Sequence, residues 1–240
     1  RVSLTGVSAQ ISREAIGVMA SLVPPRRISL IHAALHPDAR ARRRSWAAFA
    51  KNLETVAAHG HRLIVSVVAT PDVLARYDEI AARPELMGFR PVPKMMRDPW
   101  RGKRYPASYT DEERESFRAA HRWAREGYAA LIADPAERPT IWPLGDDEML
   151  EETLVFHGNE CEAGRRFVAI EEDGKTYRCG TDGYLGNLLD GTLALSPRPI
   201  ACATSYCPYF CRKHSHKPLF RHRASRNTPL VATANIALHR

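Results

Sequence analysis

Two nearly continuous apolar runs mark the first third of the chain. Residues 28–34 and 63–68 each have the pattern of a strand buried on both faces, which is typical of a parallel sheet. Residues 43–59, which lie between them, carry apolar side chains at the spacing of one helical face. The members of this stripe are Trp46, Phe49, Leu53 and Val56. Strand, helix and strand at this spacing predict a parallel crossover.

The alternation of helix and strand continues on both sides of this crossover. Residues 12–23 have the apolar spacing of a helix, and residues 70–82 begin with threonine as N-cap and proline at the first helical position. Residues 88–93 form a weaker strand candidate because they contain prolines. The pair Thr110 and Glu113 forms a capping box that opens a helix reaching about residue 131. We therefore predict an α/β fold with a parallel sheet.

Ligands of such sheets bind at the carboxyl ends of the strands. The residues near these predicted ends are Thr5, His32, Ala34, Ser66 and Pro91. They are the first candidates for a binding site in this half of the chain.

The last third begins with a predicted β-hairpin. Residues 166–171 and 175–179 are rich in β-branched and aromatic side chains, and Asp173-Gly174 between them is a strong hairpin signal. A two-residue turn pairs Glu172 with Lys175 and Val168 with Cys179. Cys179 then leaves the hairpin at its open end, where Cys161 also arrives.

All five cysteines lie in this region, at Cys161, Cys179, Cys202, Cys207 and Cys211. Four thiolates around one centre suit either zinc or an iron–sulfur cluster, although the short C-x2-C knuckles common in zinc sites are absent. The last three are spaced C-x4-C-x3-C, so one loop can supply two ligands at little entropic cost. Unligated core thiols remain an alternative. The odd number of cysteines and the lack of a secretory leader argue against disulfides.

The pattern C-x12-G-x4-C, formed by Cys161, Gly174 and Cys179, is followed by Tyr184-Leu-Gly-Asn-Leu and the remaining cysteines. This arrangement resembles the auxiliary-cluster region of radical SAM enzymes, the SPASM or shortened twitch domain. The resemblance implies a small C-terminal domain, here residues 151–215, that holds a 4Fe–4S cluster through cysteine. Cys161 and Cys179 would be ligands, and two of the other three cysteines would complete the set.

Residues 1–150 resemble, less specifically, the later strands of the partial (β/α)6 barrel of the same family. Residues 2–8 are similar to its third strand, residues 29–37 to its fourth and residues 65–71 to its fifth. The family binds S-adenosylmethionine at the ends of these strands. This implies a cofactor site formed by Thr5, His32, Ala34 and Ser66.

Two features of this region depart from the family pattern. Gly6 stands where asparagine is usual and Ala34 where serine is usual, and both changes remove polar groups that contact S-adenosylmethionine. The motif CxxxCxxC, which supplies three ligands to the catalytic cluster of the family, is absent from the chain. We therefore expect this chain to be inactive by itself and to derive from a longer parent that holds S-adenosylmethionine and a second 4Fe–4S cluster.

For a complete parent, the resemblance implies cleavage of S-adenosylmethionine to a 5′-deoxyadenosyl radical that modifies a peptide, a protein or a small molecule. A reductant such as a flavodoxin or ferredoxin would be a further partner. The rival hypothesis is a binding module stapled by zinc, whose basic tail engages nucleic acid or an acidic partner.

The composition limits these choices. The chain has 240 residues and a formal net charge of +8, much of it scattered arginine, so a generally basic surface is favoured over a nucleic-acid partner. No apolar run reaches about eighteen residues, which predicts no membrane span. We expect a cytoplasmic protein, with residues 216–240 as a basic tail.

Other chemically interesting residues are weaker candidates. The histidines His36, His59 and His61, the acidic residues 146–148 with Glu151 and Glu152, and His214 and His216 beside Cys211 are all more simply explained as surface residues. Residues 94–105, which include Met95, Met96 and Trp100, are expected to form a long loop over the edge of the sheet.

Overall fold

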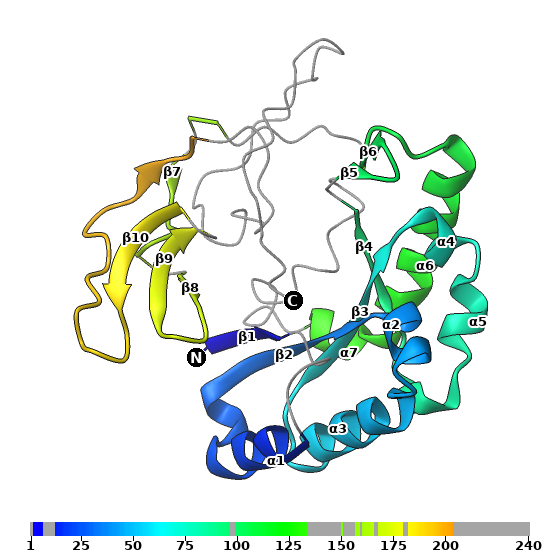
Figure 1. Ribbon diagram of the computed structural model, residues 1–240, viewed down its shortest axis with the longest axis horizontal. Helices are drawn as coiled ribbons and strands as arrows, with labels where there is room; N and C mark the ends of the chain where they lie inside the picture. The colour runs from blue at the N-terminus through cyan, green and yellow to red at the C-terminus, as the bar shows by residue number, and fades with distance from the viewer. Residues whose placement is uncertain are drawn as a thin grey trace. The chain divides into compact units, whose positions relative to one another are not determined.

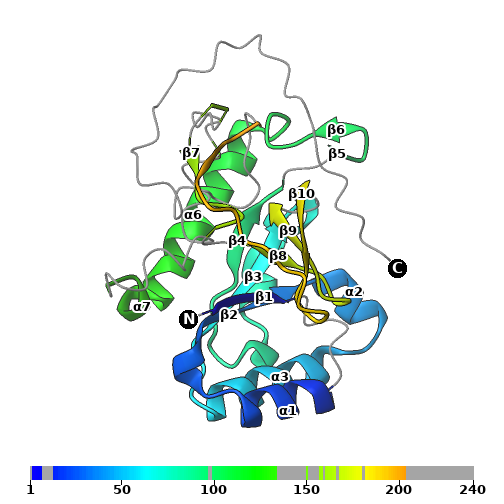
Figure 2. The same ribbon diagram turned by 90° about the vertical axis from the view of Figure 1, so that its left-hand side faces the viewer.

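A computed structural model describes residues 2–6, 13–96, 99–133, 150, 157–158, 160–165, 168–179 and 182–203. The chain divides into two units, Arg1–Glu151 (unit 1) and Glu152–Arg240 (unit 2). Figure 1 and Figure 2 show the elements of each unit. No helix among the described residues is long and apolar enough to cross a membrane.

Unit 1 is mixed α/β and contains a four-stranded sheet in which all neighbouring strands are parallel, in the order β1-β2-β3-β4. The strands are β1 (Val2–Gly6), β2 (Ile28–Leu35), β3 (Leu63–Ala69) and β4 (Val92–Met95). The helices are α1 (Arg13–Leu22), α2 (Pro37–Arg42), α3 (Trp46–Ala58), α4 (Pro71–Leu74), α5 (Tyr77–Ala81), α6 (Asp111–Gly127) and α7 (Ala129–Ala133), with short 3-10 turns at Pro25–Arg27 and Pro84–Leu86. The predicted α/β class and parallel crossover are confirmed. The described strands form an open sheet, not a closed barrel.

The predicted helix over residues 70–82 is divided in two. Its start is confirmed, because the Thr70 hydroxyl accepts a hydrogen bond from the Val73 amide at 3.2 Å. The helix then stops after Leu74 and begins again at Tyr77. In the second helix the Tyr77 hydroxyl donates a short hydrogen bond to the Pro91 carbonyl. That contact fixes α5 against the segment entering β4, so tertiary packing overrides the continuous helical pattern.

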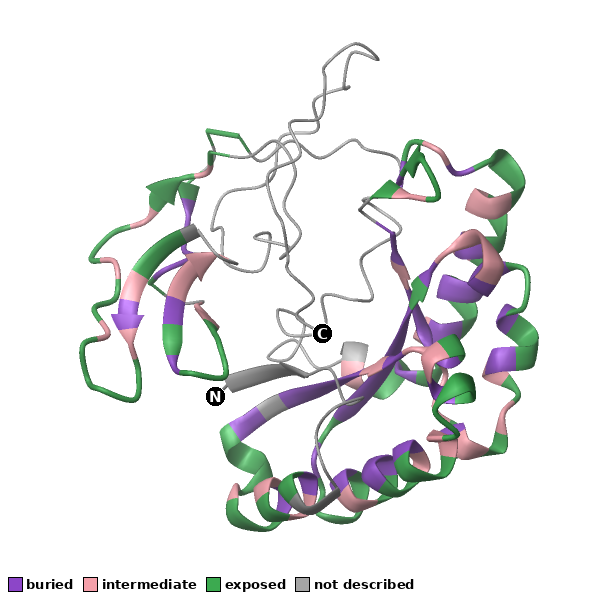
Figure 3. Cartoon of the chain, in the orientation of Figure 1, coloured by how far each residue is buried: buried purple, intermediate pink, exposed green. Residues whose placement is uncertain are grey.

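One side of the sheet is apolar at the described positions of β2 and β3. The side chains of Ile31, Ala33, Leu35, Leu63, Val65 and Val67 pack with residues of α1, α3, α4 and α5 in the main core. Figure 3 shows these strands as largely buried. The helix predicted over residues 43–59 contributes Phe49, Leu53 and Val56 to this core, as its apolar stripe indicated. This face accounts for most of the packing of unit 1.

The opposite side of the sheet carries a second, smaller apolar cluster near the amino ends of the strands. There Leu30, Ile64 and Val92 form a second cluster with Ala124 and Tyr128 of α6 and its C-cap. The Tyr128 hydroxyl accepts a hydrogen bond from the Val65 amide at 3.1 Å and donates one to the Arg90 carbonyl at 3.0 Å. The end of α6 is thereby fixed under β3 and β4.

This buried phenol predicts that unit 1 loses stability at alkaline pH. Burial raises the pKa of Tyr128 to about 12, against about 10 in an unfolded chain. The pKa of Tyr128 is higher in the folded chain than in the unfolded chain, so folding favours the neutral phenol. The resulting stabilisation of about 3 kcal/mol is complete below about pH 10 and is lost as the pH rises through about 12. Urea unfolding followed by tryptophan fluorescence at about pH 9 and about pH 12 should show the loss.

A Tyr128→Phe variant should have a smaller pH-dependent loss of stability, although it starts from a lower stability because the Val65 amide loses its acceptor. The variant Tyr184→Phe, at an exposed position of unit 2, serves as the control. The same pH dependence in Tyr128→Phe and the control would contradict the assignment. Burial also raises the pKa of Tyr77, so part of the loss should persist in the variant.

The described residues of unit 2 form short strands in two small sheets. The three-stranded antiparallel sheet has the order β10-β9-β8, with β8 (Ala169–Ile170), β9 (Lys175–Cys179) and β10 (Asp182–Asn187). The second sheet pairs β7 (Glu160–Cys161) with β11 (Ile200–Ala201) in antiparallel orientation. The predicted hairpin corresponds to β8 and β9.

The register predicted for this hairpin is wrong by one residue. Glu171, not Glu172, lies opposite Lys175, and Ala169 is paired with Tyr177. The turn has three residues and ends at Gly174 with a φ of 81°, a left-handed conformation that glycine adopts readily. The Asp173 carboxylate accepts a hydrogen bond from the Lys175 amide at 3.0 Å, which stabilises the longer turn.

Candidate functional site

The four candidate cofactor residues of unit 1 lie on adjacent strands. The backbone register places Thr5 beside His32, and Ala34 beside Ser66. Ser66 is in turn beside Val92 of β4. The structure therefore brings the four positions into two neighbouring rows, with His32 and Ser66 in the middle of β2 and β3. Ligands of parallel sheets bind just beyond the carboxyl ends of the strands, three residues further along each of these two strands.

The centre of these rows is a buried polar pair. His32 and Ser66 are 2% and 1% exposed, and Nε2 of His32 shares a short hydrogen bond with Oγ of Ser66. Both side chains lie on the side of the sheet opposite the main core. A parallel sheet covered on both faces normally carries apolar side chains there, so two buried polar groups mark a specialised part of this face. We call His32, Ala34 and Ser66 the polar face.

The rim beyond the polar face is basic. The pKa of His36 is lowered by burial and by the nearby positive charges of Arg40 and Lys94. Arg40 is 3% exposed, donates a hydrogen bond to the Ala34 carbonyl at 3.3 Å, and lies over the Phe49 ring at 3.8 Å. Burial also lowers the pKa of Arg40 to about 10. Val68, at the end of β3, is 36% exposed beside Lys94.

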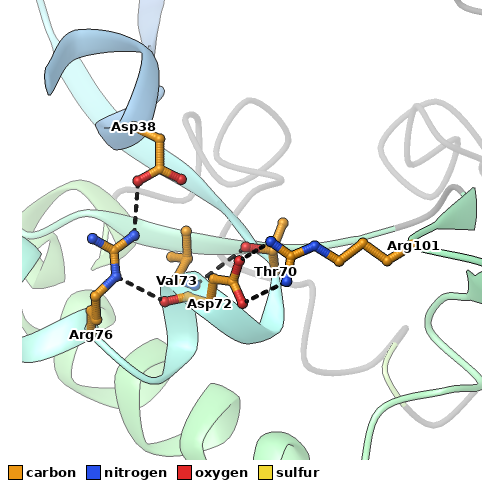
Figure 4. A network of polar contacts seen from close by, with 6 residues as sticks. All are labelled: Asp38, Thr70, Asp72, Val73, Arg76 and Arg101. Atoms are coloured by element: carbon orange, nitrogen blue, oxygen red, sulfur yellow. Dashed lines mark hydrogen bonds and ion pairs between the residues drawn. The ribbon is translucent and has the colours of Figure 1, made fainter. Parts of the chain in front are cut away.

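Segments around the carboxyl ends of β2 and β3 are joined by ion pairs (Figure 4). The Arg76 guanidinium contacts the Asp38 carboxylate at 2.8 Å, and Arg101 contacts Asp72 at the same distance. These side chains are largely exposed, and such pairs contribute about 0–1 kcal/mol each. Their effect is to order the loops around the strand ends.

The predicted loop over residues 94–105 contains a short hairpin that the sequence analysis missed. It is formed by β5 (Pro99–Trp100) and β6 (Lys103–Arg104), and its turn consists of Arg101 and Gly102 with φ of 49° and 77°. Positive φ at both central residues is the signature of a type I′ turn. Asparagine, aspartate or glycine is usual at the first central position, so the arginine there did not indicate this turn. The Arg101–Asp72 pair and the contact of Arg101 with the Trp100 ring hold this conformation.

Aromatic residues connect this hairpin to the sheet. Trp100 packs edge-on against Tyr105, and Tyr105 packs against Tyr109. The Tyr109 hydroxyl donates to the Ala69 carbonyl at 2.5 Å and accepts from the Met96 amide at 3.0 Å. The hairpin is therefore fixed to the carboxyl ends of β3 and β4.

Cys161 and Cys202 lie on neighbouring, antiparallel segments of unit 2. Cys161 is buried in β7 and pairs with Ile200 of β11, and Cys202 follows β11 by one residue. The Cys202 carbonyl accepts a hydrogen bond from the Gly158 amide at 2.8 Å, which continues the pairing beyond Glu160 and Ala201. The Cys161 sulfur accepts a hydrogen bond from the Ala163 amide at 3.4 Å. Such a bond favours the thiolate, the form of cysteine that binds metals.

Cys179 ends β9 in the other sheet of unit 2, and its neighbour Arg178 connects the two sheets. The Arg178 guanidinium donates to the Ala163 carbonyl at 3.2 Å and to the Ile200 carbonyl at 3.0 Å. The three segments that carry Cys161, Cys179 and Cys202 are thus bridged by one side chain. The sequence analysis did not identify Arg178, whose position beside Cys179 was the available signal.

The chemistry of these three residues fits a metal–thiolate centre only in part. None of the three forms a disulfide with another described cysteine. Within the described residues, no group of three or more metal-ligating side chains is close enough to hold a metal ion. Cys207 and Cys211, His214 and His216, the acidic residues 146–148, 151 and 152, and the tail 216–240 lie outside the described residues.

The other histidines have local contacts. Nδ1 of His59 bonds to the Thr55 carbonyl at 2.8 Å at the end of α3. His61 is buried, and its Nε2 contacts the Ala20 carbonyl at 3.4 Å. These contacts connect α3 and the start of β3 to their surroundings, away from the polar face.

Comparisons with family models, with curated proteins and with solved structures find no match to this chain.

Proposed function

We propose that this chain is the C-terminal portion of a radical SAM-type enzyme, in which unit 2 binds an auxiliary 4Fe–4S cluster through its cysteines. The parallel sheet of unit 1 would be the later part of the partial (β/α)6 barrel. S-adenosylmethionine and a second 4Fe–4S cluster would be present only in a longer parent. Such a parent would modify a peptide, a protein or a small molecule in the cytoplasm, with a flavodoxin or ferredoxin as reductant.

The observation that carries this proposal is the pairing of β7 with β11. It places Cys161 opposite Ile200, two residues before Cys202, and the Ala163 amide donates a hydrogen bond to the Cys161 sulfur. Both cysteines would then supply ligands to one centre from neighbouring segments. Cys179 would approach from β9, and a fourth thiol would come from Cys207 or Cys211. When bound, an iron–sulfur cluster supplies one-electron chemistry or an open iron site for substrate.

Unit 1 would contribute the binding surface for cofactor and substrate. The His32–Ser66 hydrogen bond joins two almost fully buried side chains of the polar face, so they would support the backbone of β2 and β3 beneath a bound ligand. Ala34 provides no polar group beside them, so the backbone around β1 and β2 would have to supply the missing contacts. The basic rim formed by His36, Arg40 and Lys94 favours an anionic group on the ligand.

Anaerobic reconstitution of the chain with iron and sulfide tests the proposal. We expect about four irons and four sulfides per chain, with broad visible absorption and an electron paramagnetic resonance signal after reduction. One zinc per chain without a chromophore would contradict the cluster and support the zinc-stapled binding module. Salt-dependent binding of a nucleic-acid duplex by that zinc form would then be the next measurement.

A further inference from the structure

An open pocket of about 410 Å³ lies at the amino ends of β3 and β4, away from the carboxyl ends of the strands. Its wall includes Leu63, the first residue of β3, and residues 88–90, which lead into β4. Tyr128 after α6 and Ala130 of α7 complete it from the helical side. The volume is within the range of about 300–1,000 Å³ that is usual for pockets that bind small molecules.

Large apolar side chains on this wall are in contact with water. Phe89 and Leu131 pack on the second apolar cluster but remain half-buried, and Met87 is 49% exposed. The chain turns at Met87 and Gly88, whose φ angles are 53° and 80°, before it enters the pocket wall at Phe89. A ligand with an apolar body would bury these side chains favourably, and a flexible methionine can adapt to its shape.

Two arginines border the same pocket. Arg62 is exposed, and its carbonyl accepts a hydrogen bond from the Ile31 amide at 2.9 Å, which fixes its backbone. The Arg90 guanidinium donates to the Trp123 carbonyl at 2.6 Å and lies over the Trp123 ring at 4.6 Å. A Cβ atom added to Gly127 would come within 2.6 Å of Arg90 Cδ, so this glycine makes room for the arginine. The Arg90 side chain is therefore held along the wall before any ligand binds.

The acidic group that contacts Arg90 is a weak competitor for a ligand. The Glu126 carboxylate lies 3.2 Å from the Arg90 guanidinium, and its side chain is 72% exposed. Ion pairs in such contact with water contribute little, because the solvent screens both charges. An anion inside the pocket is better shielded from water, so it can take the place of Glu126 beside Arg90.

We propose that this pocket binds a small organic anion with an aromatic body. The aromatic body packs against Met87, Phe89 and Leu131. Its carboxylate or sulfonate group faces Arg62 and Arg90, whose charges complement it. This inference is independent of the radical SAM proposal, because no cysteine and no residue of the polar face takes part in it.

The test uses two fluorescent dyes that differ only in charge. Anilinonaphthalene sulfonate carries the anionic group, and phenylnaphthylamine has the same rings without it. Both are titrated into the full chain at low ionic strength, where exposed charges are least screened. Arg62→Gln should weaken binding of the sulfonate about threefold, and Glu126→Gln should strengthen it by a similar factor, with no change for the neutral dye. Arg104→Gln, which removes an exposed arginine of β6, is the control and should alter neither affinity.

A variant that fills the pocket locates the dyes. Ala130 is exposed on α7, and Ala130→Trp should abolish binding of both dyes at this site. Leu189→Ala, at a position of unit 2 that is 75% exposed, controls for dye bound to other apolar side chains and should leave both affinities unchanged. Equal binding of the sulfonate by the full chain and by the Arg62 and Glu126 variants would overturn the proposal. Full binding by a folded Ala130→Trp variant, or no binding by the unaltered chain, would do the same. If circular dichroism shows that Ala130→Trp does not fold, the substitutions at the two exposed charged positions decide the result.

Discussion

Replacing Cys161 by alanine is expected to abolish uptake of the iron–sulfur cluster by unit 2. Cys161 is the buried one of the three described cysteines, its sulfur accepts a hydrogen bond from the Ala163 amide, and it lies in the β7–β11 ladder beside the segment of Cys202. The substitution removes one of the proposed ligands from the β7–β11 ladder. Iron content should fall from about four per chain to less than about one.

Iron and sulfide analysis with visible spectroscopy provides the measurement. The control is Leu195→Ala, which shortens an exposed side chain of the same unit and should retain the full cluster. Cys179→Ala should behave like Cys161→Ala. Among Cys202, Cys207 and Cys211, one single alanine variant should keep its cluster, because four ligands suffice and the chain has five cysteines. Four irons in Cys161→Ala would refute the assignment of this residue.

The elements that the sequence predicted best are those whose apolar pattern is satisfied by the main core. Strands β2 and β3 are buried on both faces along much of their length, so their continuous apolar runs agree with the structure. The capping box at Thr110 and Glu113 is also present, since its hydrogen bonds involve only neighbouring residues. Sequence patterns therefore predict an element well when contacts between neighbouring residues determine its structure.

The candidate residues of unit 1 were also predictable as a group. His32 and Ser66 are polar residues inside apolar runs, and parallel strands bring such positions side by side at one end of the sheet. What the sequence could not show is that the two side chains bond to each other. That contact depends on the relative register of β2 and β3, which is set by the length and packing of the helices between them.

The features that were missed depend on long-range contacts or on the exact turn length. The register predicted for the β8–β9 hairpin was wrong because the sequence Asp173-Gly174 is compatible with both two-residue and three-residue turns. Strand β10 and the bridging role of Arg178 follow from the approach of segments distant in sequence. Neither the period of the hydrophobic residues nor the spacing of the cysteines shows which distant segments come together.

The substitution Gly186→Ala is expected to destabilise unit 2, because the segment that follows β10 packs closely against that strand at Gly186. Residues 192–194 run along β10, where the Ala194 amide donates to the Leu185 carbonyl at 2.8 Å and the Thr192 amide donates to the Asn187 carbonyl at 3.1 Å. Gly186 lies between these contacts with a φ of 108°. A Cβ atom there would overlap the Thr192 carbonyl group, which is backbone and cannot rotate away.

We expect Gly186→Ala to destabilise unit 2 by about 3 kcal/mol or more, because backbone strain and overpacking each cost about 1–3 kcal/mol. Gly191→Ala is a matched control, since Gly191 also has a positive φ of 77° but has nothing within 4 Å of an added Cβ. It should show only the strain, about 1 kcal/mol. Hydrogen exchange of the amides of β9 and β10 measures the opening of unit 2 separately from unit 1. Equal protection in the two variants would mean that residues 192–194 do not pack on β10.

That result would also contradict the position of Arg178. Ser196, two residues further along the same segment, donates its amide hydrogen to the Gly164 carbonyl at 2.8 Å. This hydrogen bond supports the turn at Gly164, which the Arg178 side chain contacts.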